Sequence, residues 1–517
     1  MAFPIMRQRD LYKPHWLGKM AVLSLLAIVL AGCAGLAPVD LPTERTPPPS
    51  QALVWDALDA DHQDDWFVLL NKGPEALAWR LRAIDTATES IDLQTFLWTF
   101  DQTGSLVLDR LIAAADRGVR VKLLIDDTFL AGQDAALLEL HYHPNIQYRV
   151  FNPFKRRASG GVTRWALNLA EFDRLDHRMH NKAMVIDNRV VIVGGRNLAD
   201  EYFGLHGAAN FRDMELIVGG PIVRQLAQTF DDYWNDDWSV PVNRLSHLKT
   251  TPADLARIRQ GIDPHTPVYA PESESQRLQH WRELIAGSRR GRATLLADRP
   301  PRGNPALPQE APTQVADAIV NVFDDARDEV VIVSAYLIPT ERLESIVGRA
   351  LERGVRVRIL TNSISSNNHV TAHSAYRNHI NSLLSNGAEL HEVKSDAEDR
   401  HLYMLSPIET KALGLHAKAL IIDDDRVFIG SANLDPRSLR INTEMGLLVD
   451  SPALNADMRE AIGPDFDMAN AWQLEFDEGG EVVWVSDDGR LAVQPATSFM
   501  QRIEDWFFSH LPIEAEL

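Results

Sequence analysis

The chain has 517 residues, and 45% of them are hydrophobic, so it can bury a large core and is expected to form two or three domains. Asp and Glu number 72 against 52 Lys and Arg, which gives a net charge of −20 at pH 7. A phosphate polymer repels such an acidic protein, and nucleic acid is therefore disfavoured as a partner.

The N-terminal 33 residues have the pattern of a secretory signal. Basic residues outnumber the one acid before an apolar run from Met20 to Gly32, which is short for a membrane span. The run ends in Leu-Ala-Gly-Cys at 30–33, and Cys33 is the only cysteine, so no intramolecular disulfide can form. This resembles a bacterial lipoprotein signal, in which Cys33 is lipidated and its acyl chains anchor the protein. An uncleaved anchor is the alternative.

Both interpretations of the leader predict a membrane-associated protein on the extracytoplasmic side. The location is the periplasmic face or the outer membrane, and Ala34 after the cysteine favours the outer one. Residues 34–50 are rich in proline and lack an apolar period, which predicts an extended tether. At about 3 Å per residue this tether would reach about 50 Å from the surface.

Three separated blocks of sequence recur at one offset of 236 residues. Arg-Gly-Val-Arg-Val at 117–121 returns at 353–357. His-Asn-Lys-Ala-Met-Val-Ile-Asp at 180–187 returns as His-Ala-Lys-Ala-Leu-Ile-Ile-Asp at 416–423, and Gly-Gly-Arg-Asn at 194–197 returns as Gly-Ser-Ala-Asn at 430–433. Chance does not keep register across three blocks, so the chain is predicted to contain two copies of one unit.

Each copy has the same predicted order of strand, helix and strand. The segments are 90–96, 105–115 and 119–125 in the first copy, and 329–336, 342–351 and 355–360 in the second. This order predicts parallel strands with helical crossovers. The fold class is therefore α/β, with two pseudo-symmetric halves that are each a mixed β-sheet flanked by helices.

The predicted domains follow from this repeat and from composition. They are a lipoprotein-type signal at 1–33, a Pro-rich tether at 34–50, a first half at 51–243, a connecting segment at 244–308, and a second half with a C-terminal tail at 309–517. The aromatic residues of the tail beyond Asp450 are expected to pack on the second half, with contact to lipid as the alternative.

The recurring octapeptide carries the candidate chemistry. His180 and Lys182 alternate on a predicted strand and therefore project from one face. After a turn at Asp187, a second strand leads to glycines and to Asn197, whose amide can donate to an oxyanion. The matching residues of the second copy are His416, Lys418, Asp423 and Asn433. Together the copies are predicted to form a symmetrical cradle for a phosphodiester at the interface of the halves.

These paired His-x-Lys-x₄-Asp motifs, each followed by Gly and Asn, resemble the signature of the phospholipase D superfamily. The resemblance covers the chain from about Trp55 to its end. It implies a ping-pong reaction in which one histidine attacks phosphorus to give a phosphohistidine, while the other protonates the leaving alcohol and then activates the acceptor. Attack is assigned to His180 and acid–base work to His416, with the reverse assignment left open.

The resemblance also implies roles for the surrounding polar residues. The lysines of both motifs, with Asn197 and Asn433 as phosphate-binding residues, would stabilise the non-bridging oxygens. No metal and no other cofactor is implied. An imidazole that must keep its orientation needs a carboxylate on its far nitrogen, and Asp213 and Glu444, in matching positions, are the candidates.

The motif acids Asp187 and Asp423 complete the catalytic motifs. Each lies five residues past its lysine. We therefore expect them to anchor the turn rather than to touch the substrate.

Three further segments resemble the cardiolipin synthase branch, in particular its third bacterial type. They are Ser-Ala-Tyr-Leu-Ile-Pro at 334–339, Thr-Asn-Ser at 361–363 with His373 and Tyr376 downstream, and Leu-Pro-Ile-Glu at 511–514. That branch transfers a phosphatidyl group from one phospholipid to phosphatidylglycerol. We therefore predict a phosphatidyltransferase with phospholipid substrates. The sequence identifies no helper protein.

Three other functions compete with this prediction. A phospholipase D that hydrolyses phospholipids to phosphatidic acid shares every catalytic residue and differs in how well water is excluded. A metal-independent nuclease of the same superfamily is opposed by the acidic charge and the leader. A lipid-binding or scaffold lipoprotein without activity is disfavoured by two complete motifs.

Overall fold

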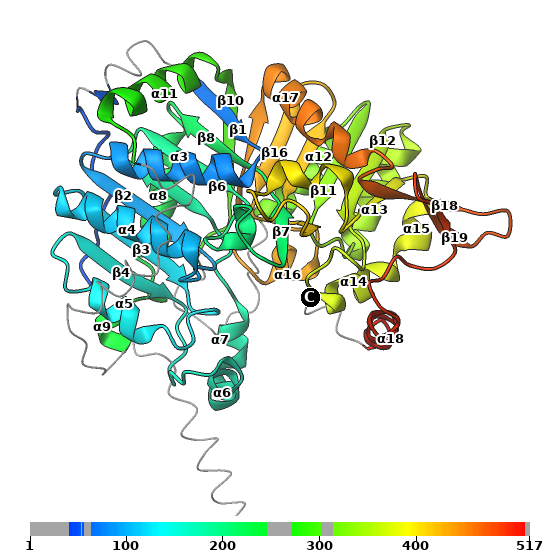
Figure 1. Ribbon diagram of the computed structural model, residues 1–517, viewed down its shortest axis with the longest axis horizontal. Coiled ribbons are helices and arrows are strands. Elements are labelled where there is room, and N and C mark those ends of the chain that lie inside the picture. The colour runs from blue at the N-terminus through cyan, green and yellow to red at the C-terminus, as the bar shows by residue number, and fades with distance from the viewer. Residues whose placement is uncertain (1–40, 53, 56–63, 246–270, 301–313, 512–517) are drawn as a thin grey trace, which may run out of the picture.

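A computed structural model describes residues 41–52, 54–55, 64–245, 271–300 and 314–511. The predicted signal with Cys33, and residues 34–40 of the predicted tether, lie outside the described residues. Figure 1 shows two α/β lobes side by side, the first blue to green and the second yellow to red. Within the described part of the chain, no helix is long and apolar enough to cross a membrane.

The first half is a mixed sheet whose central strands are runs of buried aliphatic residues, which suit a pleated surface covered on both faces. Its strands lie in the order β9-β4-β3-β2-β5-β6-β8-β1, with β2, β3 and β4 parallel and the rest antiparallel. The strands are β1 (Asp65–Leu70), β2 (Ser90–Thr95), β3 (Arg120–Asp126), β4 (Ile146–Phe151), β5 (Ala183–Ile186), β6 (Val190–Gly194), β8 (Glu215–Gly219) and β9 (Ser239–Pro241). The helices are α3 (Gly73–Thr86), α4 (Gln102–Asp116), α5 (Asp134–Leu140), α6 (Gly161–Leu167), η1 (Leu169–Glu171), α7 (Phe172–Asp176), η2 (Asp200–Tyr202), α8 (Val223–Trp234) and α9 (Val242–Leu245).

The second half repeats this sheet in the order β13-β12-β11-β15-β16-β17-β10, and a meander of β18, β19 and β20 is added beyond β13. The strands are β10 (Arg289–Ala297), β11 (Glu329–Ser334), β12 (Arg356–Asn362), β13 (Glu389–Val393), β15 (Lys418–Ile422), β16 (Arg426–Gly430), β17 (Met445–Asp450), β18 (Ala471–Phe476), β19 (Val482–Ser486) and β20 (Gly489–Leu491). The helices are α12 (Gln314–Asp325), α13 (Glu341–Glu352), α14 (Val370–Arg377), α15 (Ile380–Ser385), η4 (Glu398–Tyr403), α16 (Pro436–Arg440), α17 (Pro452–Ile462), η5 (Gly463–Phe466) and α18 (Phe499–Phe508).

The two halves are joined by backbone pairing and by a shared core. Strand β10 pairs antiparallel with both β1 and β17, so one sheet runs through both halves. A small second sheet pairs β7 (Ala209–Arg212) of the first half in parallel with β14 (Ala412–Leu415) of the second. One cluster of buried aliphatic residues contains members of both halves, such as Val185 and Val333. The halves therefore form a single packed body.

The predicted fold class and the predicted strand–helix–strand order are confirmed. The first copy forms β2, α4 and β3, and the second forms β11, α13 and β12, each within a few residues of the expected bounds. The β2–β3 and β11–β12 pairs are parallel, as the crossover helices require.

The predicted connecting segment contains regular structure that the sequence did not reveal. Helix α11 (Glu274–Ala286) packs on the first half through Trp281, and β10 is the strand that joins the two half-sheets. Strand β10 begins Arg-Arg-Gly-Arg, and its side chains are exposed or only partly buried. Its apolar alternation is therefore too weak to predict a strand.

Residues 41–50 of the predicted tether lie against the first half. The carboxylate of Glu44 contacts the buried ammonium of Lys122 at 3.1 Å and the guanidinium of Arg149 at 2.9 Å. The hydroxyl of Thr46 donates to Asp231 at 2.7 Å. This part of the tether is therefore held by charged and polar contacts and is not a free spacer, because buried cations on the domain need these partners.

The aromatic tail divides between packing and exposure. Trp472 on β18 and Trp484 on β19 are buried in the core of the second half, as expected. Trp506 and Phe507 on α18 remain exposed instead. The expectation of packing therefore holds for the strands of the tail and fails for its last described helix.

We predict that Trp281→Ala lowers the free energy of unfolding by about 3–5 kcal/mol in urea denaturation. Trp281 is fully buried between Trp55 and Trp79, and its Nε1 donates to the hydroxyl of Thr86 at 3.0 Å. The substitution thus leaves a cavity and removes the hydrogen bond that the Thr86 hydroxyl accepts, although this hydroxyl still donates to the carbonyl of Arg82 at 2.7 Å. The control Arg282→Ala, at an exposed position of α11, should change stability by less than about 0.5 kcal/mol. Equal effects of the two variants would mean that α11 is not part of the first half's core.

Candidate active site

Each histidine motif is held by backbone bonds to the opposite half. The amide of His180 donates to the carbonyl of Thr443 at 2.9 Å, and the amide of Thr443 donates to the carbonyl of Arg178 at 2.9 Å. In the other direction, the amide of His416 donates to the carbonyl of Arg212 at 2.8 Å, where the β7–β14 pairing ends. Both motifs therefore lie at the interface of the halves, just before strands β5 and β15.

The imidazoles are oriented by carboxylates that cross between the halves. Nδ1 of His180 lies 2.9 Å from both carboxylate oxygens of Glu444, and Nδ1 of His416 lies 2.7 Å from Oδ2 of Asp213. All four side chains are buried. The structure thus brings together the predicted histidines and their predicted partners, and each half supplies the carboxylate for the histidine of the other.

The two lysines sit beside their histidines. Nζ of Lys182 donates to the carbonyl of His180 at 2.7 Å, and Nζ of Lys418 donates to the carbonyl of His416. Burial lowers the pKa of Lys182 to about 7 and that of Lys418 to about 8, although Glu444 and Asp213 oppose this. These two cations make the site attractive to an anion.

Burial and the lysines keep both imidazoles neutral. Burial, with Lys182 and Lys418 nearby, holds the pKa of His180 well below its usual range, and burial with Lys418 lowers that of His416 to about 3. Although burial alone would raise it, the pKa of Asp213 is held low by His416. Burial raises the pKa of Glu444 to about 8, against the effect of Lys182. A neutral imidazole is the form that can attack phosphorus.

The predicted phosphate-binding asparagines are both buried at the interface. Nδ2 of Asn197 donates to the hydroxyl of Tyr202 at 2.9 Å, and its Oδ1 accepts weakly from the amide of Leu97 at 3.3 Å. Among the described residues, the bond to Tyr202 is the one contact that the Asn197 amide donates, which leaves its other N–H for a ligand. Oδ1 of Asn433 has no hydrogen-bond partner among the described residues.

The motif acids lie at the far ends of their strands. The carboxylate of Asp187 accepts the amides of Glu89 and Ser90 at 2.8 Å and Nε1 of Trp55 at 2.7 Å. Asp423 accepts the amide of Asp328 at 2.8 Å in the matching place. The structure thus places both acids as turn anchors that fix β5 and β15 to neighbouring strands, and not beside the imidazoles.

Four contacts of the site were missed by sequence reasoning. Phe96 lies edge-on to His180 with ring centroids 4.9 Å apart, and Tyr202 lies edge-on to His416 at the same distance. The hydroxyl of Ser431 donates to Glu444, whereas the equivalent Gly195 packs so closely on Asp213 that a Cβ there would collide with it. Gly195 and Ser431 occupy equivalent positions of the repeat, and this difference is the sequence feature that could have indicated unlike surroundings for the two carboxylates.

Asn362 and Tyr376, from the segments that resemble the cardiolipin synthase branch, make buried hydrogen bonds in the second half. Nδ2 of Asn362 donates to the carbonyls of Ala335 and Leu415, at 2.9 and 2.8 Å, which fixes the residue before His416. Tyr376 donates to Glu392 at 3.1 Å. These contacts favour packing over lining a pocket for Asn362 and Tyr376.

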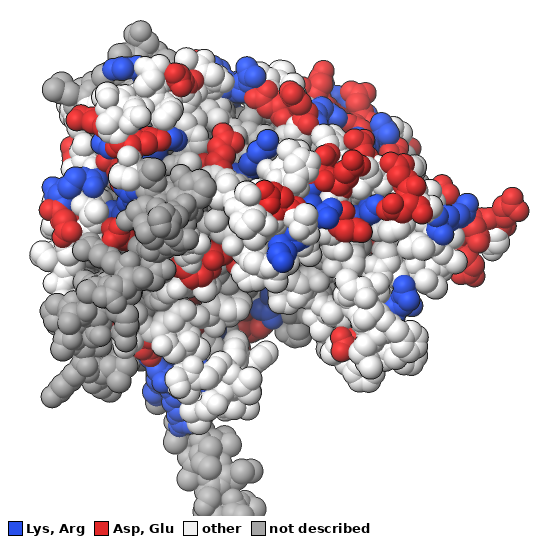
Figure 2. All heavy atoms as spheres, viewed as in Figure 1, with Lys and Arg blue, Asp and Glu red and all other residues white. Residues whose placement is uncertain are grey.

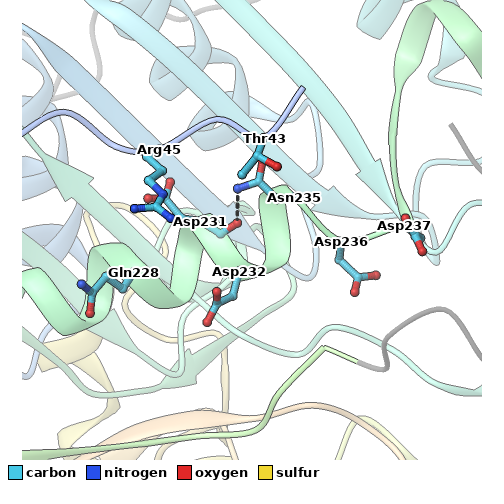
Figure 3. Close-up of a pocket in the computed structure, with 8 residues that line it drawn as sticks. All are labelled: Thr43, Arg45, Gln228, Asp231, Asp232, Asn235, Asp236 and Asp237. Carbon is cyan, nitrogen blue, oxygen red and sulfur yellow. Dashed lines mark hydrogen bonds between the residues drawn. The ribbon is translucent and has the colours of Figure 1, made fainter. Parts of the chain in front are cut away.

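A separate acidic cavity adjoins the docked N-terminal segment. It measures about 680 Å³, lies between residues 43–45 and α8, and is lined by Asp231, Asp232, Asp236 and Asp237 among others (Figure 3). Its lining contains none of the motif residues, so it is distinct from the site at the interface.

Comparisons with known proteins agree with this geometry. The family model described as cardiolipin synthase, phospholipase D-like domain, matches twice, at residues 81–234 and 319–465. Cardiolipin synthase C of Escherichia coli K12 is 34% identical over 459 residues, which cover 86% of this chain and 94% of the relative. Cardiolipin synthase B of the same strain is 25% identical over 403 residues, covering 76% and 78%.

A solved structure shares the fold. Phosphatidylserine synthase of Haemophilus influenzae aligns with a TM-score of 0.52 at 15% identity, covering 81% of this chain and 91% of that one. The fold and the paired motifs define a phospholipase D-type phosphatidyltransferase that acts on phospholipids. The chain belongs to the phospholipase D superfamily, in its cardiolipin synthase-like branch, as its motifs indicated.

We predict that acid destabilises the protein through His416. In the folded state its pKa is about 3, whereas an unfolded histidine titrates near 6.5, so below pH 6.5 only the unfolded state takes up this proton. Stability from this group is complete above about pH 6.5 and falls by up to about 1.4 kcal/mol per pH unit as the pH drops toward 3. In urea denaturation from pH 7.5 to 5, His416→Gln should lose stability less steeply than the wild type, by up to about 1.4 kcal/mol per pH unit below pH 6.5, while the slope that His180 contributes remains in both proteins. Parallel curves would show that His416 is charged in the folded protein.

Proposed function

We propose that the protein synthesises cardiolipin by transferring a phosphatidyl group from one phospholipid to the hydroxyl of phosphatidylglycerol. The observation that carries the proposal is the crossed pair of neutral, carboxylate-oriented imidazoles at the interface. It is supported by the 34% identity to a relative named cardiolipin synthase C.

In the first step, Nε2 of His180 forms a bond to phosphorus, and the bond from phosphorus to the leaving alcohol breaks. The imidazolium of His416 gives its proton to that alcohol. Positive charge develops on His180 as it attacks, and this charge favours the ionised form of Glu444, whose pKa burial raises to about 8 in the site without ligand. The Glu444 carboxylate at Nδ1 then offsets the charge on His180. The product is a phosphohistidine that holds the phosphatidyl group.

In the second step, neutral His416 takes the proton of the phosphatidylglycerol hydroxyl as this oxygen attacks phosphorus. The nitrogen–phosphorus bond then breaks and frees His180. Asp213 stabilises the imidazolium that forms at His416. An anionic phosphodiester in the site raises the pKa of His416 from its low value without ligand, because it offsets the buried lysines.

The cations and amides have a common task in this mechanism. Lys182 and Lys418, with Asn197 and Asn433, stabilise the charge on the non-bridging oxygens of the phosphoryl group. The lysines contribute most, because a buried cation interacts more strongly with an anion than it does in water.

We expect purified protein incubated with phosphatidylglycerol, with and without phosphatidylethanolamine, to form cardiolipin when the lipid products are resolved. His180→Ala should abolish product formation, because no nucleophile remains. The matched control His206→Ala changes an exposed histidine of the same half and should retain activity. Phosphatidic acid as the only product would identify a hydrolase instead. Retention of a tenth of the activity by His180→Ala would refute its assignment as nucleophile.

The leader supports a location for this reaction. We propose that Cys33 is lipidated and anchors the protein on the extracytoplasmic side of a membrane, since Leu-Ala-Gly-Cys at 30–33 follows a basic and then an apolar stretch. Cells grown with labelled palmitate should incorporate label into the wild type and not into Cys33→Ser. Label in both proteins, or in neither, would contradict the lipid anchor.

A further inference from the structure

Helices α6 and α18 bury charged side chains and expose apolar ones. In α6 only Arg164 is buried, while Val162 is 88% exposed. In α18 only Asp505 is buried. The exposed apolar residues are Val162, Leu167, Leu169 and Phe172 at and after α6, and Phe499, Met500, Ile503, Trp506 and Phe507 on α18. A helix that faces water has the opposite pattern, so these two surfaces suit an apolar neighbour.

The buried charges fix this inverted orientation in the first half. The carboxylate of Asp127 is fully buried and accepts from Arg157 at 2.6 Å and from Arg164 at 3.1 Å. Arg157 also contacts Asp134 at 2.5 Å. Since separating a buried ion pair is strongly unfavourable, α6 cannot turn its apolar side inward.

The second half holds α18 in a similar way. Asp505 is fully buried, and it contacts Nδ1 of His373 at 2.7 Å and the guanidinium of Arg377 at 3.0 Å, both on α14. The side chain of Gln501 donates to the carbonyl of Ile364 at 2.7 Å. The polar side of α18 thus serves as its attachment, and its aromatic side is left exposed.

The two helices lie on the same side of the molecule. Figure 1 shows α6 and α18 at its lower edge, one below each half. Figure 2 shows this edge mostly without charge, with basic residues beside α6, whereas acidic residues gather on the opposite edge. The exposed basic residues before α6 are Lys155 and Arg156, and the exposed acids nearby are Asp173 and Glu504. An apolar surface with basic residues beside α6 suits a phospholipid interface that contains anionic headgroups.

Both helices are connected to the active site. Through η1 and α7, α6 leads within a short stretch of chain to His180. The ring of Phe96, edge-on to His180, also packs edge-on against Phe129, which is 47% exposed. On the other side, α18 rests on α14, and His369 before α14 packs against Tyr336. The apolar surfaces therefore belong to elements that surround the site.

We propose that α6 and α18 dock on a phospholipid bilayer and insert their exposed apolar side chains among the headgroups, so that the interface site is turned toward the membrane holding its substrates. The inference rests on the proposed lipid transfer. A bilayer is the occupant because two separate patches, one from each half, face one way, and a flat apolar surface with anionic headgroups covers both at once.

Insertion of α18 can be measured on the full chain by the fluorescence of Trp506. Wild type and Trp506→Phe are reconstituted in vesicles of phosphatidylcholine and phosphatidylglycerol with brominated acyl chains. We expect bromine to quench a component of the wild-type emission that Trp506→Phe lacks. Equal fractional quenching of the two proteins would place Trp506 in water and overturn the proposal.

The role of both surfaces is tested by the double variant Val162→Glu with Phe507→Glu, which adds a charge to each. The matched control is Phe476→Glu, at an exposed position of β18 away from both helices. All proteins keep the same N-terminal segment, so that any anchoring by Cys33 is equal in all of them. With phosphatidylglycerol in vesicles, the double variant should be slower by about tenfold or more, and the control unchanged. With short-chain phosphatidylglycerol as dissolved monomers, the double variant and the control should both agree with the wild type within about twofold.

The outcomes separate the two proposals. Unchanged rates of the double variant on vesicles would overturn bilayer docking. Wild type that releases no cardiolipin from vesicles or monomers would refute the proposed function, while the quenching result would still decide docking. If sedimentation shows that the variant only breaks a dimer of this chain and leaves vesicle rates unchanged, a second copy covers the helices and the bilayer proposal is wrong.

Discussion

The structure depends on the crossed pairing of imidazole and carboxylate between the halves. His180 of the first half is oriented by Glu444 of the second, and His416 of the second by Asp213 of the first. Neither half holds a complete site, because each histidine would otherwise lack the carboxylate that fixes its Nδ1 proton. The shared sheet through β10, the β7–β14 pair and the common aliphatic core keep these partners in place. The folded arrangement of the chain and the geometry of its site therefore both depend on the interface between the two halves.

Electrostatics at this interface favour an anionic ligand. Lys182 and Lys418 are buried beside two neutral imidazoles, and the carboxylates of Asp213 and Glu444 are already occupied by those rings. Burial lowers the pKa of the two lysines to about 7 and 8, and their charges, together with burial, lower the pKa of the imidazoles beside them. A phosphodiester placed between the halves completes the charge balance. How far such a site excludes water is the property that separates transfer from hydrolysis.

Charged side chains also position the segments that look irregular in the sequence. Glu44 pairs with buried Lys122 and so holds the chain after the leader against the first half. Asp127 and Asp505 anchor helices whose other faces are apolar. In each case an acid with two charged or imidazole partners, rather than a hydrophobic stripe, determines the orientation, since separating these groups would leave an isolated charge away from water. Because charged side chains hold these segments in place, apolar periodicity in the sequence does not predict where they lie.

The sequence by itself determined the repeat, the α/β class, the two strand–helix–strand units and the residues of both motifs, because apolar periodicity and repeated motifs are local and survive in one dimension. It also identified Asp213 and Glu444 as orienting acids, by their matching positions. Only the tertiary structure decided which acid meets which histidine, since that pairing depends on how the halves face each other. Strand β10, the docked residues 41–50 and the exposed aromatic side of α18 were likewise settled by long-range contacts, which leave no periodic trace in the chain.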